Sequence, residues 1–156
     1  MTTLSSEAIT PDSLALPVNR ASLTYWLSKR GGRSMPSRAD LDPAEIVSIL
    51  PYVFLLDVRR EPLDFRYRLI GTRMAQYMTS DHTGGWMSQI DHQRPPSRIW
   101  SSCEAVVRSK APLTSDIPYV GINHDFLSTE DVMMPLSDDD REVNMIFVTA
   151  DFLKRV

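Results

Sequence analysis

Three histidines have the widest chemical range of any side chains in this sequence, because an imidazole can transfer protons or bind a metal. His82, His92 and His124 could each serve as an axial ligand of a haem iron or bind another metal. None stands in a distinctive ligand motif, since His82 and His92 occur in segments containing Asp and Gly and His124 occurs in a turn. We therefore expect all three imidazoles to face solvent, and we expect no metal site.

The single cysteine and the acidic residues offer less chemistry. Cys103 lies between Ser102 and Glu104, inside the longest helical pattern, which favours a buried small side chain. The consecutive carboxylates of Asp138–Asp140 lack the alternating spacing of a calcium loop and indicate a solvated turn. The sequence has no nucleophile elbow, no phosphate-binding glycine loop and no His-Glu-x-x-His pair. These observations predict a protein without enzymatic activity.

Arginines and aspartates gather in a loop and on two expected strands. In a structural interpretation, each guanidinium pairs with a carboxylate or a loop carbonyl. In a functional interpretation, the arginines bind an anionic metabolite or the acidic face of a partner protein. We favour the structural interpretation, because each arginine has an acidic residue in the same segment. The cluster comprises Arg33, Arg38, Asp40, Asp57, Arg66 and Arg68.

Length and charge limit the class of protein. A chain of 156 residues corresponds to one domain, because domains contain about 100–200 residues. The net charge of -3 argues against a nucleic-acid partner. No segment approaches the roughly 18 uninterrupted apolar residues of a membrane span, and no signal peptide is evident. With one cysteine, these features predict a cytoplasmic protein that does not insert into a membrane.

The helices and strands that position these side chains are predicted from the spacing of apolar residues and from the residues that begin or end each element. Residues 1–19 have few bulky apolar side chains, and we predict a flexible arm there. Asp42-Pro43-Ala44-Glu45 supplies an N-cap, a proline and an N3 carboxylate, which predict a helix starting at Pro43. Further helices are predicted at 20–30, 72–78 and 97–110, and strands at 52–59, 65–69, 113–120, 125–136 and 142–153.

This order predicts an α+β fold in a single domain over residues 20–156. Two strands, a helical middle and three more strands favour a five-stranded antiparallel sheet with helices on one face. Residues 20–50 would form an N-terminal helical extension, and residues 52–153 would form the core.

Local motifs add a resemblance that covers about residues 22–153. The most specific are Pro36-Ser37-Arg38-Ala39-Asp40 and the strand Phe65-Arg66-Tyr67-Arg68-Leu69-Ile70-Gly71-Thr72. Further matching positions are Trp26, Arg30–Arg33, Met35, Asp42-Pro43, Glu45-Ile46, Leu50-Pro51, Asp57-Val58, Asp81, Thr83-Gly84 and Met134–Leu136. With these motifs the chain resembles a PAS-like family of small stand-alone proteins known mainly from alphaproteobacteria.

The resemblance implies a sensory or regulatory PAS fold with no established common ligand. Such a module holds a small molecule between its long helix and the sheet. Haem and a flavin adduct are disfavoured, because the histidines lack a ligand motif and Cys103 lies inside the helix rather than before it. The candidate walls of this pocket are Tyr67, Leu69, Tyr77, Trp100, Cys103, Val107, Met133, Met145 and Phe147.

A module without an output domain must signal through contacts with a regulatory protein partner. We expect the outer face of the sheet and the helix bearing Leu23, Trp26 and Leu27 to provide that surface, and the helix could also form a homodimer. The alternative is a constitutive protein-interaction domain that binds no ligand. In that case large side chains fill the pocket, namely Trp86, Trp100, Tyr77 and Phe147.

Overall fold

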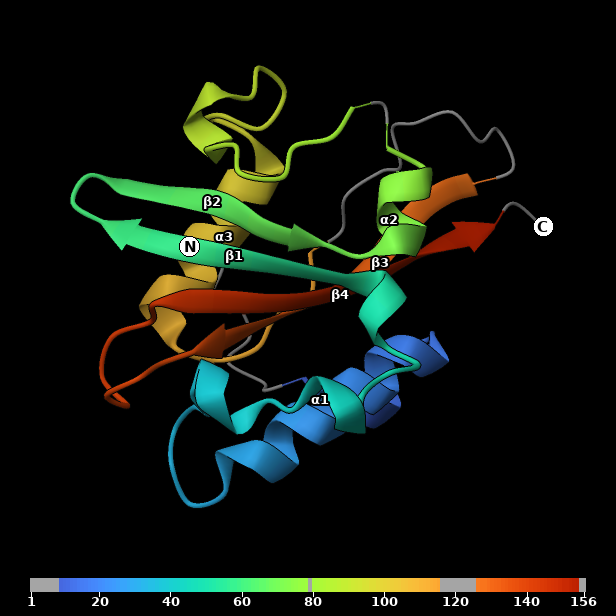
Figure 1. The fold of residues 1–156 in the computed structure, drawn as a ribbon, viewed down its shortest axis with the longest axis vertical. Coiled ribbons are helices and arrows are strands. Elements are labelled where there is room, and N and C mark those ends of the chain that lie inside the picture. Colours follow the sequence, from blue (N-terminus) through green and yellow to red (C-terminus); the bar gives the residue numbers. More distant parts are fainter. Residues whose placement is uncertain (1–8, 79, 116–125, 155–156) are drawn as a thin grey trace, which may run out of the picture.

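The computed structural model describes residues 9–78, 80–115 and 126–154 (Figure 1). Its helices are α1 (Pro17–Arg30), α2 (Thr72–Gln76) and α3 (Arg98–Ser109), and its strands are β1 (Val53–Arg60), β2 (Leu63–Ile70), β3 (Phe126–Leu136) and β4 (Met145–Lys154). Single 3-10 turns occur at Pro11–Ser13, Arg38–Asp40, Pro43–Glu45, Leu50–Tyr52 and Met87–Gln89. No helix in the described ranges has the length and apolar character needed to cross a membrane.

The four strands form one antiparallel sheet in the order β2-β1-β4-β3. The prediction of five strands is wrong for the part of the chain described. Leu113 exchanges two backbone hydrogen bonds with Met133, of 3.0 and 2.8 Å, but the Ser115 N–H donates to the Asp131 carboxylate instead of a strand backbone. The ladder therefore stops after a single bridge. Residues 116–120 of the expected strand lie outside the described residues.

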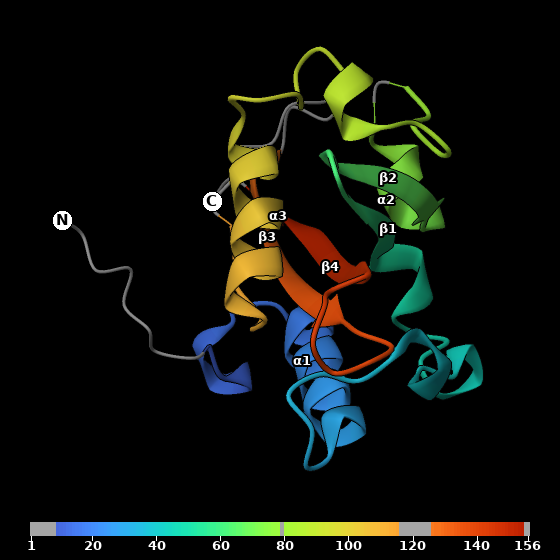
Figure 2. The same ribbon diagram turned by 90° about the vertical axis from the view of Figure 1, so that its left-hand side faces the viewer.

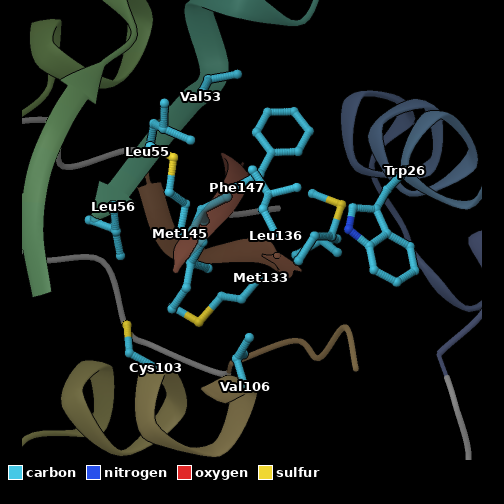
Figure 3. Close-up of a cluster of buried hydrophobic side chains, with 14 of the residues drawn as sticks. Trp26, Val53, Leu55, Leu56, Cys103, Val106, Met133, Leu136, Met145 and Phe147 are labelled. Atoms are coloured by element: carbon cyan, nitrogen blue, oxygen red, sulfur yellow. The ribbon is translucent and has the colours of Figure 1, made fainter. Parts of the chain in front are cut away.

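Helices cover both faces of this sheet, whereas the sequence suggested one face (Figure 2). Successive side chains of a strand point to opposite faces. On β4, Thr149 bonds to Ser22 of α1, while Val148 faces the side of α3. Figure 3 shows Cys103 and Val106 reaching the sheet from α3 and Trp26 reaching it from α1. We call these the α1 face and the α3 face.

The start of α1 is fixed by β3. The Glu130 carboxylate accepts the backbone N–H groups of Ala15 (2.7 Å) and Leu16 (2.8 Å), and also bonds to the Asn19 side chain (2.9 Å). Leu14 is buried in the core. The flexible arm predicted for residues 1–19 does not include residues 15–19, because this segment bonds to β3 and is helical from Pro17. Residues 1–8 lie outside the described residues.

The apolar stripe of α1 packs within its own chain. Leu23 and Trp26 are both fully buried, and Trp26 Nε1 donates to the Pro135 carbonyl at 2.9 Å. Leu27 is half-buried and packs against the same core. The prediction that these residues form a partner or dimer surface is wrong, because the apolar α1 face of β3 and β4 already occupies the stripe.

The helix predicted at Pro43 is replaced by two 3-10 turns. Asp42 caps the first turn as predicted, accepting the Ala44 N–H at 3.0 Å. However, the Ile46 N–H bonds to the Pro43 carbonyl, three residues back, so the turn that begins at Pro43 is 3-10 and not α-helical. This tighter path buries Ile46 and Ile49.

Candidate functional site

A cavity of about 370 Å³ lies on the α3 face of the sheet. Its floor is apolar and comes from three strands. Its walls are α2, the first turn of α3, the loop that joins these two helices, and side chains of β2 and β3. The floor residues are Phe54, Leu56, Met133, Val148, Ala150 and Phe152, and the wall residues are Tyr67, Met74, Tyr77, Met78, His82, His92, Gln93, Ser97, Arg98, Ile99, Thr129 and Asp131.

The end of the cavity beneath α2 is apolar and aromatic. Met74, Ala150 and Phe152 are buried as one cluster, and Tyr77 packs edge-on against Phe152 with ring centroids 5.2 Å apart. Figure 1 shows α2 next to the C-terminal end of β4, away from α3. Arg73 covers this end from outside through its ion pair with Asp151 at 3.0 Å. This end suits a hydrocarbon or an aromatic group.

Tyr67 of β2 carries the innermost polar group of the opposite wall. Its hydroxyl donates to Gln93 Oε1 at 2.6 Å, and both side chains are buried. Burial raises the pKa of Tyr67 well above the usual phenol value, so the hydroxyl stays protonated. The Ser97 hydroxyl bonds to the Gln93 carbonyl and also caps α3 by accepting the Trp100 N–H at 3.1 Å. One chain of contacts thus links β2, the loop and α3.

Two imidazoles lie in the same part of the cavity wall. The rings of His82 and His92 are 5.7 Å apart, and the His82 ring is 6.2 Å from that of Tyr67. Burial lowers the pKa of His82, and the neighbouring His92 lowers it further, while Asp81 opposes both effects. The expectation that these two histidines face solvent is wrong for His82, which is half-buried, whereas His92 is exposed at the edge of the cavity. His124 lies outside the described residues.

The β3 side of the cavity contains a buried carboxylate. Asp131 is 4% exposed, and it accepts the Ser115 N–H at 2.7 Å and the Ser115 hydroxyl. Cys103 is fully buried nearby, as expected for a small core residue. Burial raises the pKa of the Cys103 thiol, and Asp131 raises it further, so the sulfur remains protonated.

Three of the nine predicted wall residues line the cavity, namely Tyr67, Tyr77 and Met133. Met145 and Phe147 belong to the α1 face, because they lie four and two residues before Thr149 on β4 and alternate side chains of a strand point to the same face. Leu69 does not line the cavity because of a β-bulge between β1 and β2. Leu55 pairs with Leu69, but the next residue, Leu56, pairs with Tyr67. The extra residue in β2 puts Leu69 on the face of the sheet opposite to Tyr67. The remaining three, Trp100, Cys103 and Val107, pack farther along α3 as part of the core.

Sequence reasoning missed the loop residues, although a signal was present. A segment that joins the short helix to the long helix must pass the space between them. His82, His92 and Gln93 all lie in that segment. Their neighbours Gly84 and Gly85 bond to the backbone of Tyr67 at the edge of β2, with N···O distances of 2.6 and 3.0 Å. This pairing holds the loop against the cavity.

The six charged residues do not form one cluster. Arg33 pairs with Asp40 at 2.8 Å, and Arg38 donates to the Leu41 carbonyl at 3.1 Å, all within the loop after α1. The Ser37 N–H and then Arg33 lower the pKa of Asp40. On the strands, Asp57 pairs with two arginines, at 3.0 Å with Arg66 and 3.6 Å with Arg68. The contacts of each group lie within its own segment, which favours the structural interpretation.

The acidic turn between β3 and β4 is held by its own backbone. The N–H groups of Glu142 and Arg141 both donate to Asp139 at 2.9 Å, and they lower the pKa of this carboxyl to about 2. Asp140 accepts the backbone N–H groups of Ser34 and Met35 at 3.0 Å each. Across the described ranges, no three His, Cys, Asp or Glu side chains are grouped as metal ligands.

An α+β domain with a four-stranded antiparallel sheet and a cavity under its helices fits a sensory module. The family model of the PAS domain matches residues 15–148, so the chain belongs to the PAS domain family. No curated protein and no solved structure matches the chain. The family points to a sensory or regulatory role, because PAS domains are generally non-enzymatic signalling modules.

Proposed function

We propose that this protein is a non-enzymatic sensory module that binds a small molecule in the cavity and passes its occupancy to a regulatory protein partner. The observation that supports the proposal best is the cavity of about 370 Å³ with an apolar floor and a few convergent polar groups. Ligand sites in proteins have this size and composition, roughly 300–1,000 Å³. Membership in the PAS family supports the same role.

The alternative, a constitutive interaction domain with a self-filled core, requires large side chains inside this space. Trp100 packs on Phe65 instead, with ring centroids 5.0 Å apart. Phe147 belongs to the α1 face, and Trp86 lies over Arg59 at 4.5 Å. Of the four candidates only Tyr77 borders the cavity, and it forms a wall without filling the space. This arrangement favours the ligand-binding role.

The loop beside the cavity offers a route for the signal to the other face. His82 and Trp86 belong to one short segment that pairs with the edge of β2. The Trp86 ring lies under the guanidinium groups of Arg59 (4.5 Å) and Arg66 (5.6 Å). A ligand that shifts His82 would therefore shift Trp86 and the arginines beside it. The partner would contact this surface, where Leu69 is 44% exposed.

The test is to ask whether the purified protein retains a small molecule. Denaturing extraction followed by mass spectrometry should recover one compound in stoichiometric amount. Ala150→Phe places a phenyl group in the cavity and should abolish recovery, whereas Ala44→Phe makes the same change at an exposed position and should not. If the wild-type protein yields no compound, the constitutive interaction domain becomes the better account.

A further inference from the structure

The polar groups of the cavity are distributed unevenly. The end beneath α2 offers only apolar and aromatic groups together with the Tyr77 side chain. His82 and His92 lie 5.7 Å apart, measured between ring centroids, in the loop part of the wall, and Arg98 lines the cavity from the start of α3. This wall contains the residues of the cavity lining that can carry positive charge. A ligand that satisfies both ends must be apolar at one end and acidic at the other.

We propose that the ligand is an amphipathic organic acid whose carboxylate lies against His82, His92 and Arg98 and whose apolar body extends toward α2. This proposal rests on the proposed function, because it requires the cavity to be a ligand site. It specifies the chemical class of the ligand and the orientation in which it binds.

The geometry of the basic wall suits a single anionic group. The ring centroids of the two imidazoles are 5.7 Å apart, so one carboxylate at the edge of the cavity can reach both rings. His82 Nε2 also lies 3.3 Å from the Ser80 hydroxyl, which leaves Nδ1 of His82 for the carboxylate. Arg98 is the first residue of α3, a helix of 12 residues, so the positive end of its dipole faces the same region. The ring of Tyr67 is 6.2 Å from that of His82, and its protonated hydroxyl already donates to Gln93.

The acidic groups near this wall are satisfied elsewhere. Asp81 accepts the Thr83 N–H at 2.9 Å, and Asp91 pairs with Arg94 at 3.6 Å. Asp131 borders the cavity from β3, which is separated from β2 by the two central strands. Its carboxylate is held by Ser115. An anion at the histidines is therefore on the side of the cavity opposite the buried carboxylate.

Binding of an acid at this wall must be linked to protons. Burial and His92 disfavour the charged form of His82 and lower the pKa of His82, while Asp81 opposes them. A bound carboxylate favours that charged form, so the pKa of His82 rises on binding and a proton is taken up. Affinity for the acid then increases as the pH falls, by at most about tenfold per pH unit for one proton.

A matched pair of fluorescent probes tests this directly. The anion 1-anilinonaphthalene-8-sulfonate and the neutral N-phenyl-1-naphthylamine share one aromatic body, and neither changes charge between pH 6 and pH 8. We expect both to bind the wild-type protein in fluorescence titrations. The anionic probe should bind about fivefold or more tightly at pH 6 than at pH 8, and the neutral probe equally at both.

Substitutions of the basic residues that line the cavity test whether these residues cause the pH dependence of the anionic probe. The double variant His82→Gln and His92→Gln should remove the pH dependence of the anionic probe and leave the neutral probe unchanged. Arg98→Gln should weaken the anionic probe at both pH values. Arg94→Gln removes an exposed arginine of the same loop that does not border the cavity, and it should leave both probes unaffected.

The outcomes separate this inference from the proposed function. If the neutral probe binds and the anionic probe shows no preference for low pH, the ligand class is wrong and the cavity remains a ligand site. If neither probe binds, or if binding survives Ala150→Phe, the cavity itself is not the site and both proposals fail.

Discussion

The two faces of the sheet are packed in different ways although the same strands supply both. On the α1 face, Trp26 and Leu23 are fully buried, and the polar side chains Asn19, Ser22 and Thr149 bond to one another. On the α3 face, the helix covers part of the sheet, and the rest borders a cavity of about 370 Å³. The comparison teaches that side chains on one face of these strands form a closely packed core, while side chains on the other face line a cavity.

The largest expected effect is the loss of the tryptophan that seals the α1 face. Trp26→Ala removes a fully buried ring and leaves the Pro135 carbonyl without its 2.9 Å donor. It should lower the free energy of unfolding by about 3–5 kcal/mol in a denaturant titration. Trp100→Ala, at a half-buried position on α3, serves as the comparison and should cost less. An equal loss for the two tryptophans would contradict the contrast between the faces.

The second effect concerns the carboxylate that anchors α1. Glu130→Ala leaves the Ala15 and Leu16 N–H groups and the Asn19 side chain without their charged acceptor. The free energy of unfolding should fall by about 2–3 kcal/mol, and hydrogen exchange at residues 15–19 should accelerate. Glu142→Ala removes an exposed carboxylate on the same hairpin and should change stability by less than about 1 kcal/mol.

Thr149 and Ala150 are neighbours on β4 but point to opposite faces of the sheet, so substitutions at these two positions compare the two faces most directly. Thr149→Val keeps the shape but deprives Ser22 and Asn19 of a buried partner, which should cost about 1–2 kcal/mol. Ala150→Phe adds a larger side chain on the other face, where Ala150 borders the cavity, and it should lower stability less than Thr149→Val does because the ring can extend into the cavity. Thermal denaturation of both variants measures the difference. A greater loss from Ala150→Phe would mean that the α3 face is as tightly packed as the α1 face.

The smallest effect lies in the acidic turn and appears only at low pH. The pKa of Asp139 is lowered to about 2 by the N–H groups of Glu142 and Arg141, so its stabilising contribution is complete above the unfolded-state pKa, about 4. The contribution is lost as the pH falls from about 4 toward 2. Asp139→Asn should therefore reduce the difference in thermal stability between pH 6 and pH 2.5. A pH profile identical to that of the wild-type protein would contradict this assignment.

Much of the fold could be predicted from the sequence, because helix and strand patterns are local. The helix at 20–30 exists but begins at Pro17, and its apolar stripe is where the spacing of Leu23 and Trp26 placed it. The sequence could not show what covers that stripe, because the answer depends on which face of the sheet the chain returns to. An amphipathic helix has the same pattern whether it packs against its own sheet or against a partner.

The candidate site was harder to predict, because it depends on which face of the sheet each strand residue points to and on the path of one loop. In a regular strand Tyr67 and Leu69 share a face, but one extra residue in the bulge separates them. His82 and Gln93 carry no periodic signal and reach the cavity only because the loop crosses between two helices. Long-range register and loop paths are decided by the assembled fold.

The pairing of the loop with β2 also bears on how molecules of this protein meet one another. β2 forms one margin of the sheet, where exposed N–H and C=O groups would invite a strand from a neighbouring molecule. Here Gly84, Gly85 and Trp86 already occupy part of that margin. Fewer backbone groups along this edge are therefore free to pair with a strand of another molecule.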